Sequence, residues 1–176
     1  MEIEKALLGF IPGVTKEILV EAIHQDPSLF DQFWKMALSG KEPAGWRAAW
    51  VADAYDEKYP GRFTPYLPHL CERVGVEKNV GVRRAILRTL TRYDIPAAYK
   101  TTVIDACFRY LWEGKTVCDK VMSMKILYRM ALEQPELRKE LYDSIELQLD
   151  MDAGSKGFIG AGKKTLAALR KKDPSL

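Results

Sequence analysis

Histidine and cysteine are too scarce in this chain to build a common metal centre or a disulfide framework. The 176 residues include two histidines, His24 and His69, and three cysteines, Cys71, Cys107 and Cys118. No Cys-x-x-Cys occurs, and neither histidine has a second His or Cys at ligand spacing, so a zinc site is not expected. An odd number of cysteines also disfavours a disulfide scaffold. We therefore expect no metal ion, and cysteines that serve as small apolar side chains.

Long apolar runs are also missing. No stretch approaches the roughly 18 apolar residues of a membrane span. The opening stretch, MEIEKALLGF, carries acidic residues where a secretory signal would be basic, and Gly9, Pro12 and Gly13 break its apolar run. We expect a cytoplasmic protein without a membrane segment.

The chain as a whole has no large excess of positive or negative charge, but its two parts differ in net charge. The net charge is +3, yet residues 1–57 carry −5 and residues 58–176 carry +8. This asymmetry favours an anionic partner for the C-terminal part, although scattered surface charge also serves solvation alone.

Period-two alternation is absent, and the apolar residues instead recur with the period of an α-helix. One such face contains Trp46, Ala49, Trp50 and Ala54, and another contains Val82, Ile86, Leu90 and Tyr93. Prolines punctuate the chain between these faces, and proline is well tolerated in the first turn of a helix. We therefore expect Pro27, Pro43, Pro65, Pro96 and Pro135 to stand at the first helical positions. The pattern predicts about nine helices and no sheet.

The helical segments repeat. Placing WRAAWVADAY over VRRAILRTLT at an offset of 36 puts Trp46 on Val82 and Trp50 on Ile86. This alignment predicts that both tryptophans belong to the core. A period in the upper thirties with two helices per period is typical of an α-solenoid, in which each helix pair is covered by its neighbour.

The segment VGVRRAILRTLTRYDIP resembles a HEAT-type repeat, and GWRAAWVADAYDEKYP resembles a second, more aromatic copy. The resemblance covers roughly residues 43–150. It implies an all-α fold, an α-α superhelix of about four helix pairs plus a C-terminal capping helix, in one domain over residues 1–176. Residues 1–40 would form an N-terminal capping pair, 43–150 the repeat core and 155–172 the capping helix. HEAT and armadillo-like arrays mostly bind proteins and sometimes nucleic acids.

One stretch, GFIGAGKKT at residues 157–165, is close to a phosphate-binding loop. Such a loop requires a preceding strand and a Ser or Thr directly after its lysine, where this chain has Lys164 after Lys163. We expect a Gly-rich turn that opens the last helix, with Ser155 as its cap, and no nucleotide cofactor.

Basic residues offer a candidate surface for an anionic partner. Arg84, Arg88 and Arg92 follow one another at i, i+4 and i+8, and the last helix adds Lys163, Lys164 and Arg170. On adjacent helices these cations could follow a phosphate backbone. The alternative is a solvated face with ion pairs to Asp53, Asp56 and Glu57 of the preceding repeat.

Trp46, Trp50 and Asp53 are candidate groove residues. A carboxylate walled by aromatics in a basic groove is similar to HEAT-like DNA glycosylases of the alkylation-repair type, whereas the simpler interpretation makes Asp53 a solvent-facing or loop-capping residue. No catalytic residue is assigned, because no Ser–His–Asp, Cys–His or paired-carboxylate pattern occurs. The leading hypothesis is a non-catalytic scaffold that binds another protein. The alternative is a DNA-binding relative of the glycosylases, with or without activity.

Overall fold

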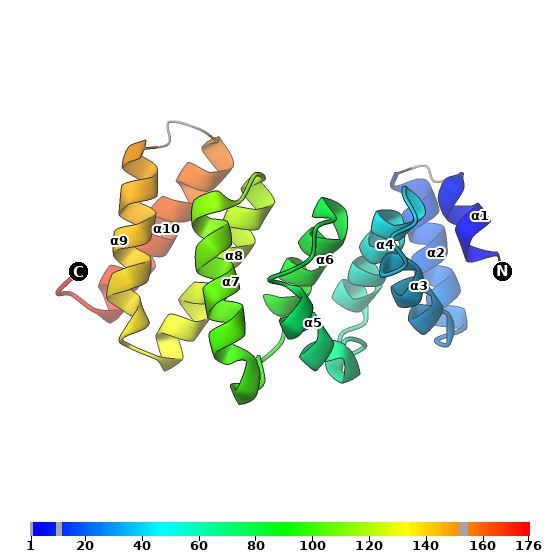
Figure 1. Ribbon diagram of the computed structural model, residues 1–176, viewed down its shortest axis with the longest axis horizontal. Coiled ribbons are helices and arrows are strands. Elements are labelled where there is room, and N and C mark those ends of the chain that lie inside the picture. The colour runs from blue at the N-terminus through cyan, green and yellow to red at the C-terminus, as the bar shows by residue number, and fades with distance from the viewer. Residues whose placement is uncertain (1, 10–11, 152–154) are drawn as a thin grey trace. The chain divides into compact units, whose positions relative to one another are not determined.

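The computed structural model describes residues 2–9, 12–151 and 155–176, and these residues form ten α-helices, two short 3-10 helices and no strand (Figure 1). The α-helices are α1 (Ile3–Leu8), α2 (Val14–Gln25), α3 (Leu29–Ala37), α4 (Ala44–Lys58), α5 (Leu67–Arg73), α6 (Val80–Leu90), α7 (Lys100–Glu113), α8 (Val117–Glu133), α9 (Leu137–Met151) and α10 (Lys156–Lys172). The 3-10 helices, η1 (Thr64–Tyr66) and η2 (Ala97–Tyr99), precede α5 and α7. The predicted all-helical fold is confirmed. Within the described ranges, no helix combines the length and the apolar character needed to cross a bilayer.

The helices group into two compact units, unit 1 (Met1–Tyr93) and unit 2 (Asp94–Leu176). In unit 1, α4 packs against α1, α2, α3 and α6, and α6 also contacts α5. In unit 2, α8 packs against α7, α9 and α10, and α9 also contacts α7 and α10. The expected four helix pairs and last helix correspond in chain order to α2 through α10, and α1 is additional. The organisation as one domain stays a prediction.

Aromatic rings form the core of unit 1. The Phe63 ring stands edge-on to both Phe30 and Trp34, with ring centroids 5.0 and 4.9 Å apart. Phe30, Phe33, Trp34 and Phe63 are all buried. Because edge-to-face aromatic pairs add to the free energy of burial, this cluster fixes α3 against the segment that leads into α5.

Aliphatic residues and one phenylalanine form the core of unit 2. Leu111 of α7, Leu127 of α8 and Ile145 of α9 are buried together with Phe158 and Leu169 of α10. The spacing of eleven residues between Phe158 and Leu169 keeps both on one face of α10, since eleven residues complete about three helical turns. The opposite face of α10 is therefore left to solvent.

The prolines lie mostly before the helices, and none of the five occupies the first helical position, so that expectation is wrong. Pro27 and Pro135 stand two residues ahead of α3 and α9, and Pro43 and Pro96 flank α4 and η2. The physical reason is a turn: the Leu29 N–H donates to the Asp26 carbonyl, and the Leu137 N–H donates to the Gln134 carbonyl. Proline suits the second position of such a turn, which then continues as a helix. Of these five prolines, only Pro65 lies inside a helix, as the second residue of η1.

The three cysteines are free thiols, and two of them are inaccessible. Cys71 and Cys107 are fully buried, whereas Cys118 is half-buried. Burial raises the pKa of the Cys71 thiol to about 11, with the nearby Glu72 acting in the same direction.

Only a thiolate reacts readily with a disulfide reagent. We expect Ellman's reagent to label at most one thiol in the folded protein and three in denaturant; rapid labelling of Cys71 in the folded protein would contradict this assignment.

Candidate partner-binding cavity

A cavity of about 270 Å³ lies between α4 and α6 in unit 1. Its lining residues come from these two helices only: Trp46, Trp50, Asp53, Gly81, Arg84, Ala85 and Arg88. On each helix they recur at intervals of three, four and seven residues, which places them on one helical face. The fold thus brings together two groups that the sequence presents separately, the groove residues of α4 and the arginine stripe of α6.

The two tryptophans form an aromatic wall. The Trp46 and Trp50 rings are nearly parallel, with an interplanar angle of 23° and centroids 6.3 Å apart. Cations lie over the rings: the Arg47 guanidinium is 5.4 Å from the Trp46 centroid, and the Lys16 ammonium is 5.8 Å from the Trp50 ring. Both indoles are half-buried, so each presents part of its surface to solvent.

The expectation that Trp46 and Trp50 belong to the core is wrong. Their repeat equivalents Val82 and Ile86 are buried, but the tryptophans are not. The reason is that α4 is covered by α2 and α3 as well as by α6. Most of the buried positions beside the tryptophans carry small side chains, Ala48, Ala49, Val51 and Ala52, and the buried aromatic residue of α4 is Tyr55, near its end. Helices that approach from several directions leave no interior space for an indole, so the large rings lie at the edge of the packing.

Asp53 lies at the floor of the cavity, with only 1% of its surface exposed. Its Oδ1 accepts a hydrogen bond from Arg92 Nη2 at 2.8 Å, and its Oδ2 lies 3.1 Å from Arg88 Nε. Burial raises the pKa of Asp53, because it penalises the charged form, while Arg92 and Arg88 act in the opposite direction. Both carboxylate oxygens are therefore engaged by guanidinium groups.

The arginine stripe is largely neutralised by α4. Arg88 also pairs with Glu57 at 2.8 Å, and Arg92 also pairs with Asp56 at 3.1 Å. These are the ion pairs that the alternative interpretation of the stripe predicted. Arg84 differs: it is exposed, and its guanidinium forms no ion pair or hydrogen bond with any residue of the described ranges. Arg84 is therefore the cation of the cavity that is available to a ligand.

Asp56 has a structural role that the sequence did not reveal. Its fully buried carboxylate accepts hydrogen bonds from the Arg62 and Phe63 backbone N–H groups at 2.9 and 3.3 Å, and from the Tyr93 hydroxyl. With the Arg92 ion pair, Asp56 ties the turn at residues 59–63 to the end of α6. The only signal in the sequence was that the repeat offset places Asp56 near Arg92.

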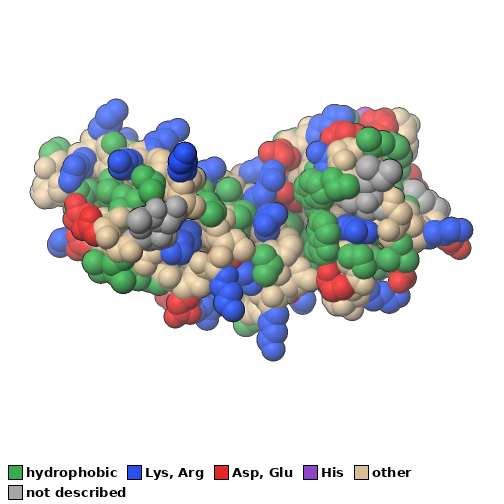
Figure 2. Space-filling model, turned by 90° about the horizontal axis from the view of Figure 1, so that it is seen from above, with side chains coloured by type: hydrophobic (Ala, Val, Ile, Leu, Met, Phe, Trp, Pro, Cys, Tyr) green, Lys and Arg blue, Asp and Glu red, His purple; other side chains and the backbone are tan. Residues whose placement is uncertain are grey.

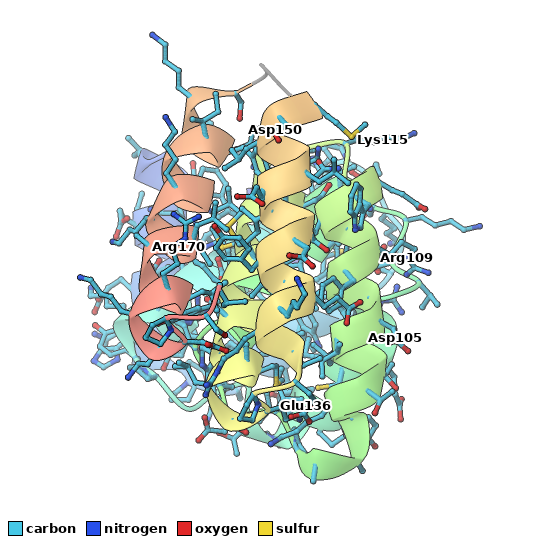
Figure 3. All side chains as sticks on the ribbon, turned by 90° about the vertical axis from the view of Figure 1, so that its left-hand side faces the viewer. Asp105, Arg109, Lys115, Glu136, Asp150 and Arg170 are labelled. Carbon is cyan, nitrogen blue, oxygen red and sulfur yellow. The ribbon has the colours of Figure 1, made fainter. Side chains whose placement is uncertain are left out.

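The basic residues of the last helix belong to unit 2 and take no part in this cavity. Lys163 and Lys164 are exposed on α10, whereas Arg170 lies between α10 and α9 (Figure 3), where it donates a hydrogen bond to the Tyr142 hydroxyl. The expectation of a Gly-rich turn at residues 157–165 is wrong, because the whole segment is helical. Ser155 caps this helix as predicted: its Oγ accepts from the Phe158 N–H at 3.1 Å. In the described ranges no group of three or more His, Cys, Asp or Glu side chains is arranged to hold a metal ion.

Comparison with known families agrees with the repeated helices. The model of the HEAT repeat domain matches residues 3–169. The chain belongs to the HEAT repeat family. Searches of curated proteins and of solved structures gave no match.

The HEAT repeats of this chain share an arginine that caps a neighbouring carbonyl. Arg47 Nη1 donates to the Leu7 carbonyl at 2.8 Å, and its repeat equivalent Arg83 donates through Nη1 to the Glu77 carbonyl at 3.2 Å. The Leu7 carbonyl lies in the last turn of α1 and the Glu77 carbonyl lies in the connection between α5 and α6, so neither belongs to the middle of a helix and each needs a donor from elsewhere. The offset of 36 therefore aligns two arginines that each donate a hydrogen bond to a backbone carbonyl outside their own helix.

Proposed function

We propose that this HEAT repeat protein is a non-catalytic binding module, and that the cavity between α4 and α6 holds a segment of a protein partner. The observation that carries the proposal is the wall of two half-buried indoles beside one unneutralised guanidinium, that of Arg84. Tryptophan and arginine are the residues most enriched among those that dominate protein interfaces.

The state of Asp53 supports binding rather than catalysis. A general base must direct a free lone pair at the proton that it removes. Here Arg92 and Arg88 each engage one oxygen of Asp53, so the carboxylate is committed to holding α6 against α4. Each oxygen keeps a second lone pair, but with 1% of its surface exposed Asp53 offers a substrate little access to it.

The chemistry of the cavity defines the partner segment. The indole faces favour an apolar or aromatic side chain, and Arg84 favours a carboxylate beside it. Arg88 and Arg92 add little to the attraction, because Asp53, Asp56 and Glu57 balance their charges. We therefore expect an acidic peptide segment with one large apolar anchor, and weak attraction of polyanions to this cavity.

A displayed library of random peptides, selected on the purified protein, tests this proposal. The selected peptides should be enriched in an aromatic or large aliphatic residue close to Asp or Glu. Measured by fluorescence anisotropy, Trp50→Ala and Arg84→Glu should each weaken binding by about tenfold or more, as loss of a residue worth at least ~1.4 kcal/mol requires. Arg109→Glu, an exposed arginine on α7, is the control with the same charge change and should bind like the original protein. Selected peptides that bind Trp50→Ala at full strength would refute the cavity as the site.

A further inference from the structure

We propose that the outer face of α10 binds the phosphate backbone of double-stranded nucleic acid. This surface lies in unit 2, so the proposal is independent of the cavity in unit 1. Helix α10 contains six basic residues and no acidic residue: Lys156, Lys163, Lys164, Arg170, Lys171 and Lys172. Figure 2 shows Lys and Arg side chains gathered along the upper left edge of the molecule, over this helix.

The cations form two rows along the solvent side of α10. Lys156, Lys163 and Arg170 are spaced by seven residues, as are Lys164 and Lys171. Seven residues make almost two turns, so each row stays on one side of the helix, with cations about 10 Å apart. All five side chains are exposed, while Phe158 and Leu169 hold the opposite face in the core. In Figure 3, long nitrogen-tipped side chains extend from α10 away from α9.

The lysine charges are available, unlike those of the arginine stripe on α6. None of the five lysines of α10 forms an ion pair or hydrogen bond through its ammonium group with a residue in the described part of the chain. Arg170 is the exception, because Tyr142 and, at 3.8 Å, Glu146 of α9 contact it. A lysine without an ion pair attracts a polyanion with its full positive charge, whereas an arginine paired with a carboxylate attracts it only weakly.

Gly160 leaves the helix backbone uncovered on this face. Glycine inside a helix costs about 0.5–1 kcal/mol relative to alanine, so it needs a reason. Gly162 has one, since an added Cβ would lie only 3.2 Å from Leu149. At Gly160 an added Cβ would meet no atom within 4 Å, so packing within the chain does not require glycine there. Gly160 and Ala167 lie between the two rows of cations and leave a strip where a ligand can reach the helix backbone.

A phosphate backbone fits these features better than a membrane surface. Binding at a bilayer interface requires an apolar face that inserts between the lipids, and the apolar face of α10 is occupied by α8 and α9. Between its rows of cations the outer face carries only Gly160 and Ala167. Contacts with nucleic-acid phosphates require no insertion, only cations at regular intervals on a surface that approaches closely.

Fluorescence anisotropy with a labelled DNA duplex of random sequence, at about 50 and 200 mM salt, tests this proposal. The unmodified protein should lose about two to three orders of magnitude in affinity over this range, because five phosphate contacts each contribute about −0.9 to the logarithmic salt slope. The triple variant Lys163→Gln, Lys164→Gln, Lys171→Gln should bind at least about tenfold more weakly, with a slope smaller by about one for each lysine removed.

The control carries three Lys→Gln changes at exposed lysines outside α10, namely Lys35, Lys78 and Lys125. It has the same net charge as the test variant and should retain the original affinity and salt slope. Far-UV circular dichroism of all three proteins checks that each is folded. Equal weakening in the control would show an effect of net charge alone and would overturn the assignment to α10. So would an unmodified protein that binds no duplex at low salt, or one that binds phosphatidylserine vesicles instead.

Discussion

Replacing Asp56 with alanine is expected to destabilise the protein by about 2–4 kcal/mol, because each buried donor left without its acceptor costs about 1–3 kcal/mol. The substitution removes the only acceptor that the Arg62 N–H has in the described ranges and one of two acceptors of the Phe63 N–H, which keeps the Tyr93 hydroxyl at 3.3 Å. The Arg92 guanidinium loses its Asp56 partner and keeps Asp53. The Tyr93 hydroxyl also loses its acceptor, although it still accepts from the Gly61 N–H at 2.8 Å. Urea unfolding followed by circular dichroism measures the change in the free energy of unfolding.

Glu57→Ala is the matched control for this effect. It removes the same charge from the next position of α4 and breaks the ion pair with Arg88, but the Glu57 side chain is 58% exposed. Exposed pairs contribute about 0–1 kcal/mol, so this variant should unfold close to the original midpoint. Adding Tyr93→Phe to Asp56→Ala should lower the free energy of unfolding further, because the Gly61 and Phe63 N–H groups then lose the Tyr93 hydroxyl as their acceptor. An Asp56→Ala variant as stable as Glu57→Ala would show that Asp56 does not hold the turn.

The fold was largely predictable because its signals are local. The helical period and the 36-residue offset depend only on residues close in sequence, and they gave the all-α class and the order of helix pairs. The offset even matched the two carbonyl-capping arginines, Arg47 and Arg83. Helix starts were less certain, because Pro27 and Pro135 fit a preceding turn as well as they fit a first helical position.

The residues that line the cavity were predicted as two separate groups, but the cavity that they form together was not. Sequence reasoning named the groove residues and the arginine stripe, and the alternative interpretation of the stripe, a solvated face, included ion pairs with Asp53, Asp56 and Glu57. It could not predict that Trp46 and Trp50 would line the space between α4 and α6. That outcome depends on how many helices cover α4, which is a property of tertiary packing and not of period. The Asp56 network was missed for the same reason.

Two glycine-to-alanine changes of the same chemistry should have opposite effects on stability. Gly81 lies where α6 passes α4, and an added Cβ would lie 2.5 Å from the Trp46 Cβ and 3.1 Å from its Cγ. The obstructing atoms sit at the base of the indole, so rotation of the ring cannot relieve the clash and the helices must separate. We expect Gly81→Ala to cost about 1–3 kcal/mol, as overpacking does, and to change the shape of the cavity.

Gly160→Ala should instead stabilise the protein by about 0.5–1 kcal/mol, because the added methyl group meets no atom and the helix no longer bears the entropic cost of glycine. Urea midpoints of the two variants decide both predictions in one experiment. If the cavity binds a peptide as proposed, Gly81→Ala should also weaken that binding while Gly160→Ala leaves it unchanged, since Gly160 belongs to α10 in unit 2. A Gly81→Ala protein with the original stability and peptide affinity would mean that α4 and α6 are not held at the separation that defines the cavity.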